Sequence, residues 1–202
     1  MTDDGELVAR LRNGDEAAFV ELIDRYNGSL LRFARTMVPN DAVAEEAVQD
    51  TWLGVVRGVA GFEGRSSLKT WLFRIVANRA RTAGVRERKA GTPLGFDSST
   101  PSVAAGRFDE GGAWSDPPGA WATEVEQVDD RMEAERLWPV VGGYLDDLPE
   151  GQRQVVTLRD VEGLAPDTVC ELLGITDANQ RVLLHRGRTR LRSALATSMG
   201  KD

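Results

Sequence analysis

The sequence predicts an all-α protein in which two helical domains are joined by a flexible acidic linker. Apolar residues recur every three or four positions along nearly every periodic stretch, which is the spacing of an amphipathic helix. No stretch alternates between apolar and polar residues as a half-buried strand does. From Gly91 to Ala122 the period is lost, and Gly, Pro, Ser and Asp predominate. We expect an N-terminal domain over 1–90, a linker over 91–124 and a C-terminal domain over 125–202.

Helices and turn residues alternate in the expected N-terminal domain. A short first helix ends at Asn13-Gly14, and Pro39-Asn40-Asp41 interrupts the chain again, with Asp41 as a plausible N-cap. A loop is expected from Gly61 to Arg65. The longer helices of this domain are expected over about 15–38, 41–59 and 68–91.

The C-terminal half is also expected to be helical. Helices should resume near Val125 and run to about Asp147, and Leu148-Pro149 should start another that continues to Val161. Two short helices are then expected over about 166–173 and 177–196. Trp114 and Trp121 are unusual in a linker of this composition. Each either docks onto a neighbouring domain or anchors a partner protein.

The composition excludes several classes of protein. No apolar run is long enough to span a membrane, and the N-terminus lacks the order of charged and apolar residues of a signal peptide, so we expect a cytoplasmic protein without membrane insertion. One Cys and one His cannot form a disulfide or a zinc site within the chain, and no cofactor is expected. No nucleophile–base pair, carboxylate dyad or Gly-rich phosphate loop is present. We therefore expect no catalytic residues and no enzymatic activity.

Charge is distributed very unevenly along the chain. The net charge is -7, but the segment from Arg65 to Lys89 carries eight bases against one acid. The segment from Gly91 to Asp130 carries eight acids against one base, and the segment from Arg181 to Asp202 carries six bases against one acid. Two basic blocks therefore flank an acidic spacer. This pattern favours a nucleic-acid partner despite the negative total.

The segment from Leu164 to Arg192 has the spacing of a helix-turn-helix. An apolar helix ends at Gly174, which suits a left-handed turn, and Thr176 or Asp177 can cap the next helix. Cys170 lies four residues before Gly174, where two crossing helices leave room only for a small side chain, so we expect it to be structural. The second helix carries side chains that can contact base edges or phosphates: Asn179, Gln180, Arg181, His185, Arg186 and Arg188. The alternative is a solvated basic face on an ordinary surface helix.

The residues before this motif resemble a known family. Leu148, Pro149 and Arg153 lead into Leu158-Arg159-Asp160 and Gly163, a pattern similar to the −35-binding domain of extracytoplasmic-function (ECF) sigma factors. Two positions depart from the common pattern. Asn179-Gln180 replaces a Thr-Val pair, which places an amide at a core position. Gly187 replaces Ala, which should cost a helix interior up to about 1 kcal/mol.

The N-terminal half resembles the same family. The helix from Ala44 to Gly58 is similar to the helix that binds core polymerase, which implies contacts from Glu45, Glu46, Gln49, Asp50 and Trp52, although Trp52 can also pack inward with Val48 and Val55. The segment from Phe62 to Lys89 is similar to the part that binds the −10 element. The residues implied there are Phe62, Arg65, Ser66, Lys69, Arg74, Asn78, Arg79 and Arg81. Trp71 and Phe73 are candidates either for base contact or for packing in the core, and the core is the favoured place for Trp71.

The resemblance implies a sigma factor that directs promoter-specific initiation. The implied partners are the clamp and flap regions of core RNA polymerase, promoter DNA in duplex and single-stranded form, and an anti-sigma factor, in a stress response. A standalone helix-turn-helix regulator is the main alternative, and it would be expected to carry a dimerisation or ligand-sensing domain. A recombinase-like enzyme would need a Ser or Tyr nucleophile among arginines, for which Ser66-Ser67 is the only candidate.

Overall fold

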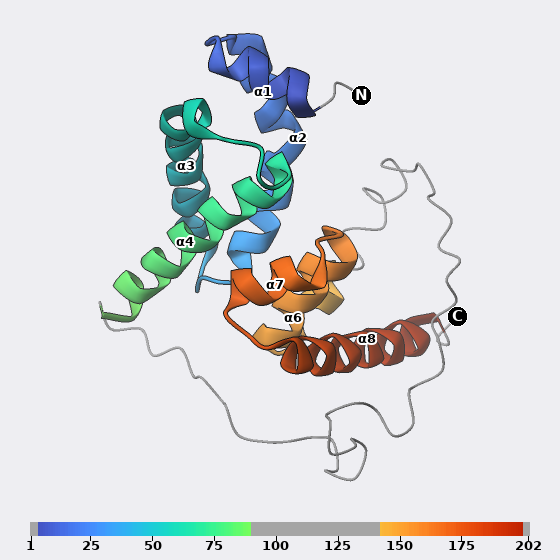
Figure 1. Ribbon diagram of the computed structural model, residues 1–202. Helices are drawn as coiled ribbons and strands as arrows, with labels where there is room; N and C mark the ends of the chain where they lie inside the picture. The colour runs from blue at the N-terminus through green and yellow to red at the C-terminus, as the bar shows by residue number, and fades with distance from the viewer. Residues whose placement is uncertain (1–3, 90–141, 200–202) are drawn as a thin grey trace. The chain divides into compact units, whose positions relative to one another are not determined.

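Every regular element that the structure describes is a helix, which confirms the all-α prediction. The computed structural model describes residues 4–89 and 142–199 (Figure 1). The expected linker over 91–124, with Trp114 and Trp121, and most of the helix expected from Val125 lie outside the described residues; 142–146 are helical. No helix within the described ranges is long and apolar enough to cross a membrane.

The N-terminal helices are α1 (Asp4–Arg12), α2 (Glu16–Arg35), α3 (Asp41–Gly58), the short 3-10 helix η1 (Val59–Gly61) and α4 (Leu68–Lys89). Their starts agree with the turn residues in the sequence, but two details differ. The N-cap of α3 is Asn40, whose side chain accepts a hydrogen bond from the Val43 backbone N–H, and Asp41 is already helical. The second helix stops at Arg35 because the Thr36 hydroxyl and backbone N–H both bond to the Phe33 carbonyl.

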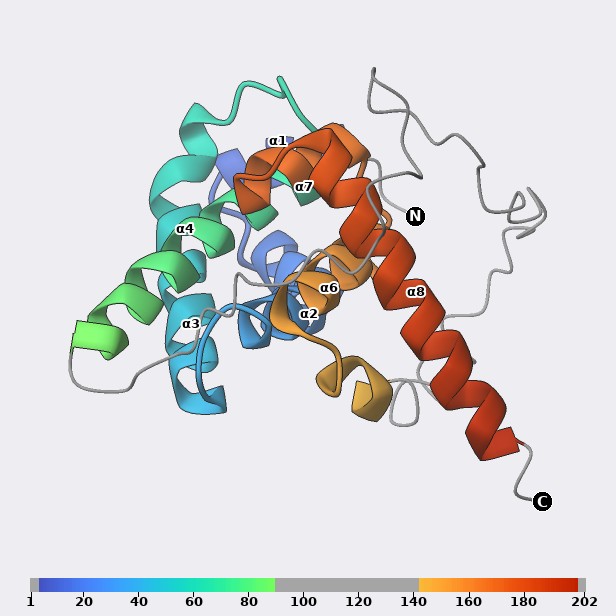
Figure 2. The same ribbon diagram turned by 90° about the horizontal axis from the view of Figure 1, so that it is seen from below.

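An apolar core joins α2, α3 and α4. Phe33 of α2 and Phe73 of α4 are both fully buried, with their ring centroids 5.6 Å apart. Both views show α4 crossing alongside α3 (Figure 1, Figure 2), where Val48 and Val55 are buried. Phe73 therefore belongs to the core, whereas Trp71, for which the core was the favoured place, is half-buried. Burying these side chains fixes which face of α3 remains in solvent.

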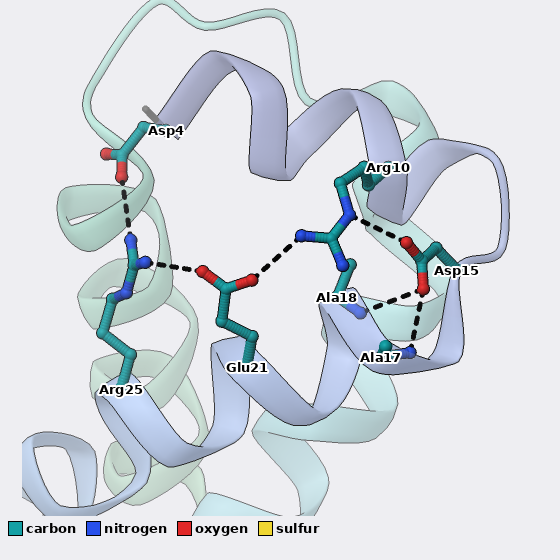
Figure 3. A network of polar contacts seen from close by, with 7 residues as sticks. All are labelled: Asp4, Arg10, Asp15, Ala17, Ala18, Glu21 and Arg25. Carbon is teal, nitrogen blue, oxygen red and sulfur yellow. Dashed lines mark hydrogen bonds and ion pairs between the residues drawn. The ribbon is translucent and has the colours of Figure 1, made fainter. Parts of the chain in front are cut away.

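A chain of ion pairs ties α1 to α2 (Figure 3). Arg10 lies 2.8 Å from the Asp15 carboxylate and 3.0 Å from Glu21. Arg25 pairs with Glu21 at 2.7 Å and with Asp4 at 3.6 Å. The hydrogen bond from Arg10 lowers the pKa of Asp15, and Asp15 in turn raises the pKa of Arg10. Asp15 also caps α2, so the same carboxylate starts one helix and holds the other.

The C-terminal helices are α6 (Glu150–Val156), η3 (Thr157–Val161), α7 (Pro166–Leu173) and α8 (Asp177–Met199). The helix expected from Leu148-Pro149 to Val161 is continuous, but its second half widens into the π-helical turn η3. Gly163 then adopts a left-handed conformation, with a φ of 66°. Figure 2 shows α8 as one uninterrupted helix, slightly longer than expected.

Gly187 of α8 packs directly against α6. A Cβ atom at this position would lie 2.6 Å from Cγ2 of Val156, which is closer than two carbon atoms can approach without a shift. The sequence suggested only a cost from this glycine. In the structure, the absence of a side chain at Gly187 lets α8 pack closely against α6. This close packing offsets the cost of placing a glycine inside a helix.

Candidate polymerase and nucleic-acid interfaces

The outer face of α3 carries the acidic and polar residues that the sequence selects. Glu45, Glu46, Gln49 and Asp50 are all exposed, because Ala44, Ala47, Val48 and Thr51 turn inward at helical spacing. Glu46 forms an ion pair with Arg86 of α4 at 2.7 Å. The face therefore presents carboxylates on a rigid helix. One of them is already partly neutralised.

Trp52 lies at the edge of this face and makes structural contacts. Its ring meets Phe19 edge-on, with centroids 6.2 Å apart, and its indole N–H donates to the Asn27 side chain at 3.0 Å. The exposed apolar residues of α3 are instead Leu53 and Val56, which are 54% and 58% exposed. The sequence reasoning missed both, although they follow Gln49 at helical spacing.

The loop before α4 is mostly exposed, but its first residue after η1 is buried. Phe62 is buried, and its ring packs on Trp71 with centroids 5.1 Å apart, so the structure does not present this side chain for base contact. Arg12 of α1 donates a hydrogen bond to the Phe62 carbonyl. Arg65 is exposed and pairs with Glu63 at 3.1 Å, whereas Ser66 is half-buried.

The basic residues of α4 divide into two sets. Arg79 and Asn78 are exposed, and the Asn78 side chain accepts a hydrogen bond from Arg81 at 3.1 Å. Lys69, Arg74 and Arg81 point toward the C-terminal helices, where each is bonded to residues of η3, α7 or their connections. The sequence placed all of these residues on one DNA-binding surface.

The helix-turn-helix has the expected geometry. Gly174 is left-handed, with a φ of 66°, and its backbone N–H bonds to the Cys170 carbonyl. The cap of α8 is Thr176, whose hydroxyl accepts from the Asn179 backbone N–H at 3.2 Å. Burial raises the pKa of the Cys170 thiol, which disfavours a reactive thiolate. The described residues contain no cluster of side chains suited to a metal ion.

The predicted base-reading residues of α8 have different environments. Asn179 and Arg181 are exposed in its first turns, and Arg181 pairs with Asp177 at 2.5 Å. Gln180 is the clearest correction: its side chain is 2% exposed, and its amide nitrogen has no hydrogen-bond partner. This position belongs to the core, because it faces inward between two exposed neighbours.

Further along α8 the basic residues are partly buried. His185 and Arg186 are half-buried. Arg188 bonds to both carboxylate oxygens of Asp160, at 2.9 and 2.5 Å, and this hydrogen bonding raises the pKa of Arg188. The guanidinium of Arg188, a candidate for phosphate contact, is thus already bonded to a carboxylate within the structure. Arg188 connects the end of the Leu158-Arg159-Asp160 segment to α8.

Two family models match the two groups of helices. Sigma-70 region 2 matches residues 22–90, and Sigma-70, region 4 matches residues 141–191. The chain belongs to the sigma-70 family. The "ECF RNA polymerase sigma-E factor" of Salmonella typhimurium is 28% identical over 185 residues, which cover 92% of this chain and 90% of that protein. Its counterpart of the same name in Escherichia coli K12 has the same identity and coverage.

Two solved structures share the fold. CnrH in complex with the cytosolic domain of CnrY has a TM-score of 0.53 at 21% identity, covering 95% of this sigma factor and 96% of that chain. The sigma factor RpoE in complex with the anti-sigma factor NepR from Bartonella quintana has the same score and identity, covering 88% and 96%. These similarities agree with the helical architecture described above.

The buried amide in the second turn of α8 leads to a stability prediction for this sigma factor. Gln180→Leu should raise the free energy of unfolding by about 1–2 kcal/mol, because it removes an unpaired polar group from the core at similar volume. Urea denaturation followed by circular dichroism measures the change. Asn179→Leu is the matched control, since its side chain is exposed and should change stability by less than about 0.5 kcal/mol. Equal effects of the two substitutions would contradict the assignment.

Proposed function

We propose that this sigma factor docks on core RNA polymerase through the exposed face of α3 and directs initiation by reading the promoter with α4 and α8. The observation that carries the proposal is the composition of α3. Its exposed carboxylates lie in the first half of the helix, and Leu53 and Val56 follow on the second half. Carboxylates would orient the encounter with a basic coiled coil of the clamp, and the apolar pair would supply buried area.

The −10 element would be held by α4. Melting a promoter exposes unstacked bases and phosphates, which basic and amide side chains on one helix can bind. Arg79 and Asn78 are exposed for this task, and Arg65 lies in the preceding loop. Because Phe62 and Trp71 pack on each other, we propose that they hold the loop in shape while polar groups make the contacts.

The −35 element would be read in duplex form by α8. Arg181 and Asn179 lie at the start of the recognition helix, where helix-turn-helix proteins reach base edges in the major groove. The side chains of Arg and Asn can each form two hydrogen bonds with one base, Arg with guanine and Asn with adenine. Thr176 and Gly174 fix the angle at which α8 leaves the turn.

The polymerase would supply all of the catalysis, and the sigma factor would contribute none. We place its action in the cytoplasm, where the polymerase works. The flap region is a second proposed contact on the polymerase, and an anti-sigma factor is a proposed regulator. The solved complex of RpoE with the anti-sigma factor NepR supports that last part.

Charge reversal on α3 tests the polymerase interface. Glu46→Lys combined with Asp50→Lys should weaken binding to core polymerase by about tenfold or more, because both carboxylates face solvent on the docking surface. Binding is measured by titrating labelled protein with core enzyme and confirmed by co-elution in gel filtration. A standalone regulator would not co-elute with core polymerase at all.

The matched control makes the same change of charge elsewhere in the N-terminal helices. Glu6→Lys combined with Asp24→Lys reverses two exposed carboxylates on α1 and α2 and should leave core binding unchanged. Circular dichroism checks that both variants keep their helical content. If the two double variants bind core polymerase equally well, α3 is not the docking surface.

A further inference from the structure

Asp177 is an exposed carboxylate at the start of the recognition helix α8. Its Oδ2 atom lies 2.5 Å from Nη2 of Arg181, one helical turn further along the chain. Side chains four residues apart are neighbours on a helix surface, so the helix itself brings the two charges together. The side chains of Asp177 and Arg181 are 48% and 64% exposed, which leaves the pair open to a molecule that approaches α8.

The cap of α8 does not use the Asp177 carboxylate. The Thr176 hydroxyl accepts a hydrogen bond from the Asn179 backbone N–H at 3.2 Å, and the Thr176 carbonyl accepts one from the Gln180 backbone N–H at 2.9 Å. The Gln180 side chain is buried, which fixes the first turn of α8 against the core. A carboxylate in this turn also stabilises the helix through its dipole, but that effect does not depend on Arg181.

A second arginine of α8 is held in a different way. Arg188 lies seven residues after Arg181, on the same side of the helix. It bonds to both carboxylate oxygens of Asp160, and the side chains of this pair are only 32% and 30% exposed. Because Asp160 comes from η3, that contact joins two elements. Arg181 pairs within its own helix, so its ion pair orients the guanidinium without attaching it to another element.

The orientation of an arginine determines what it recognises on DNA. A guanidinium reads guanine through two hydrogen bonds to O6 and N7, whereas a contact with a phosphate carries no sequence information. A long side chain held in one conformation before DNA arrives loses less entropy on binding. A carboxylate beside the guanidinium also opposes its turning toward the DNA backbone, because the carboxylate attracts the arginine and repels the phosphates.

We propose that Asp177 is a positioning residue for −35 recognition: it holds Arg181 toward the base edges and makes it a stricter reader of one base pair. The inference rests on the base contact proposed above for Arg181. Asp177 raises selectivity but lowers affinity, since its charge also faces the phosphates of the duplex. The ion pair strengthens in the groove, where water is partly excluded.

Asp177→Asn tests this role in the holoenzyme reconstituted from the full chain and core polymerase. Binding is measured on promoters that differ at single base pairs of the −35 element. Discrimination should fall about threefold to fivefold at the position where Arg181→Ala relaxes preference, and nowhere else. Affinity for all of the promoters should rise about twofold, because one negative charge near the phosphates is removed.

Three further variants serve as controls. Asp177→Glu keeps a carboxylate one turn before Arg181 and should retain most of the discrimination. Asp177→Ala should match Asp177→Asn, and it covers the case in which Asn disturbs folding, since alanine suits a helix. Asp167→Asn removes an equal charge from the exposed first turn of α7 and should leave the base preference unchanged. Circular dichroism checks the helical content of each variant.

Arg181→Ala separates the possible failures. If it leaves the base preference unchanged, the proposed base contact of Arg181 is wrong, and the inference fails with it. If Arg181→Ala changes the preference and neither Asp177→Asn nor Asp177→Ala does, Asp177 does not position Arg181. In the Arg181→Ala background, Asp177→Asn should not alter the preference further. A further change there would mean that Asp177 contacts a base itself, as a carboxylate can at the cytosine amino group, and would overturn the positioning role.

Discussion

Gly187→Ala should lower the free energy of unfolding by about 1–3 kcal/mol, which is the usual cost of forcing an extra methyl group into a packed interior. Helix propensity alone predicts the opposite sign, since alanine is favoured over glycine by up to about 1 kcal/mol inside a helix. Packing should prevail because the new Cβ would lie 2.6 Å from Val156, whose branched side chain has few alternative rotamers.

Urea denaturation of matched variants measures this effect. Gly28→Ala is the control, because a Cβ there meets only the end of the Arg32 side chain at 3.5 Å, and the substitution should stabilise α2. Adding Val156→Ala to Gly187→Ala should recover part of the lost stability, because it removes the colliding methyl group. If Gly187→Ala is as stable as Gly28→Ala, α6 and α8 are not in close contact at this position.

Arg181→Ala should change which promoters this sigma factor selects. Loss of a bidentate contact to one base should cost about 1–3 kcal/mol and relax preference at one position of the −35 element. Arg188→Ala should instead weaken binding to all sequences to a similar extent. Its guanidinium is bonded to Asp160, so its removal loosens the attachment of α8 rather than a single base contact.

A library of promoters with randomised −35 positions, transcribed by the reconstituted holoenzyme, separates these outcomes. Asn179→Ala is included because its side chain is also exposed in the first turn of α8, whereas the buried Gln180 should affect stability alone. The assignment is wrong if Arg181→Ala scales every promoter equally while Asn179→Ala changes the sequence preference.

Local signals were sufficient to predict the elements. The starts of α2, α3 and α8 coincide with capping side chains, because a cap satisfies backbone groups within one turn, which a sequence displays directly. The left-handed Gly174 was predictable for the same reason, since few other residues adopt that conformation at low cost. The π-helical turn η3 had no such signal. It ends where the Glu162 backbone N–H bonds to the Thr157 carbonyl.

The depth of individual side chains was less predictable. Gln180 and Phe62 were assigned to DNA contacts from residue type, yet both are buried. For Gln180, the polar side chain was weighted above the family pattern, which already implied a core position. For Phe62, position in a loop indicated the surface. In each case tertiary packing outweighed the local preference. Leu53 and Val56 were given no role by the sequence analysis, and the structure leaves both exposed.

The partners of the basic residues could not be read from the sequence. Lys69 and Glu162 are 93 residues apart, and the charge counts indicated only that the basic blocks favour a nucleic-acid partner. The pairing depends on the packing of α4 against the C-terminal helices, which no local pattern encodes. Charge counts along the chain do not identify which charged atoms meet.

The hydrogen bond from Arg12 to the Phe62 carbonyl has a consequence for exchanging modules between sigma factors. The region 2 match begins at residue 22, so a hybrid designed on family boundaries would leave α1 behind. In such a hybrid, the loop at Phe62 would come from one parent and the residue at position 12 from the other. The hydrogen bond from Arg12 to the Phe62 carbonyl would then be lost or made to a foreign loop. Hybrids intended to inherit −10 preference should therefore carry the donor's sequence from Asp4 onward, so that α1 and the loop it holds come from the same parent.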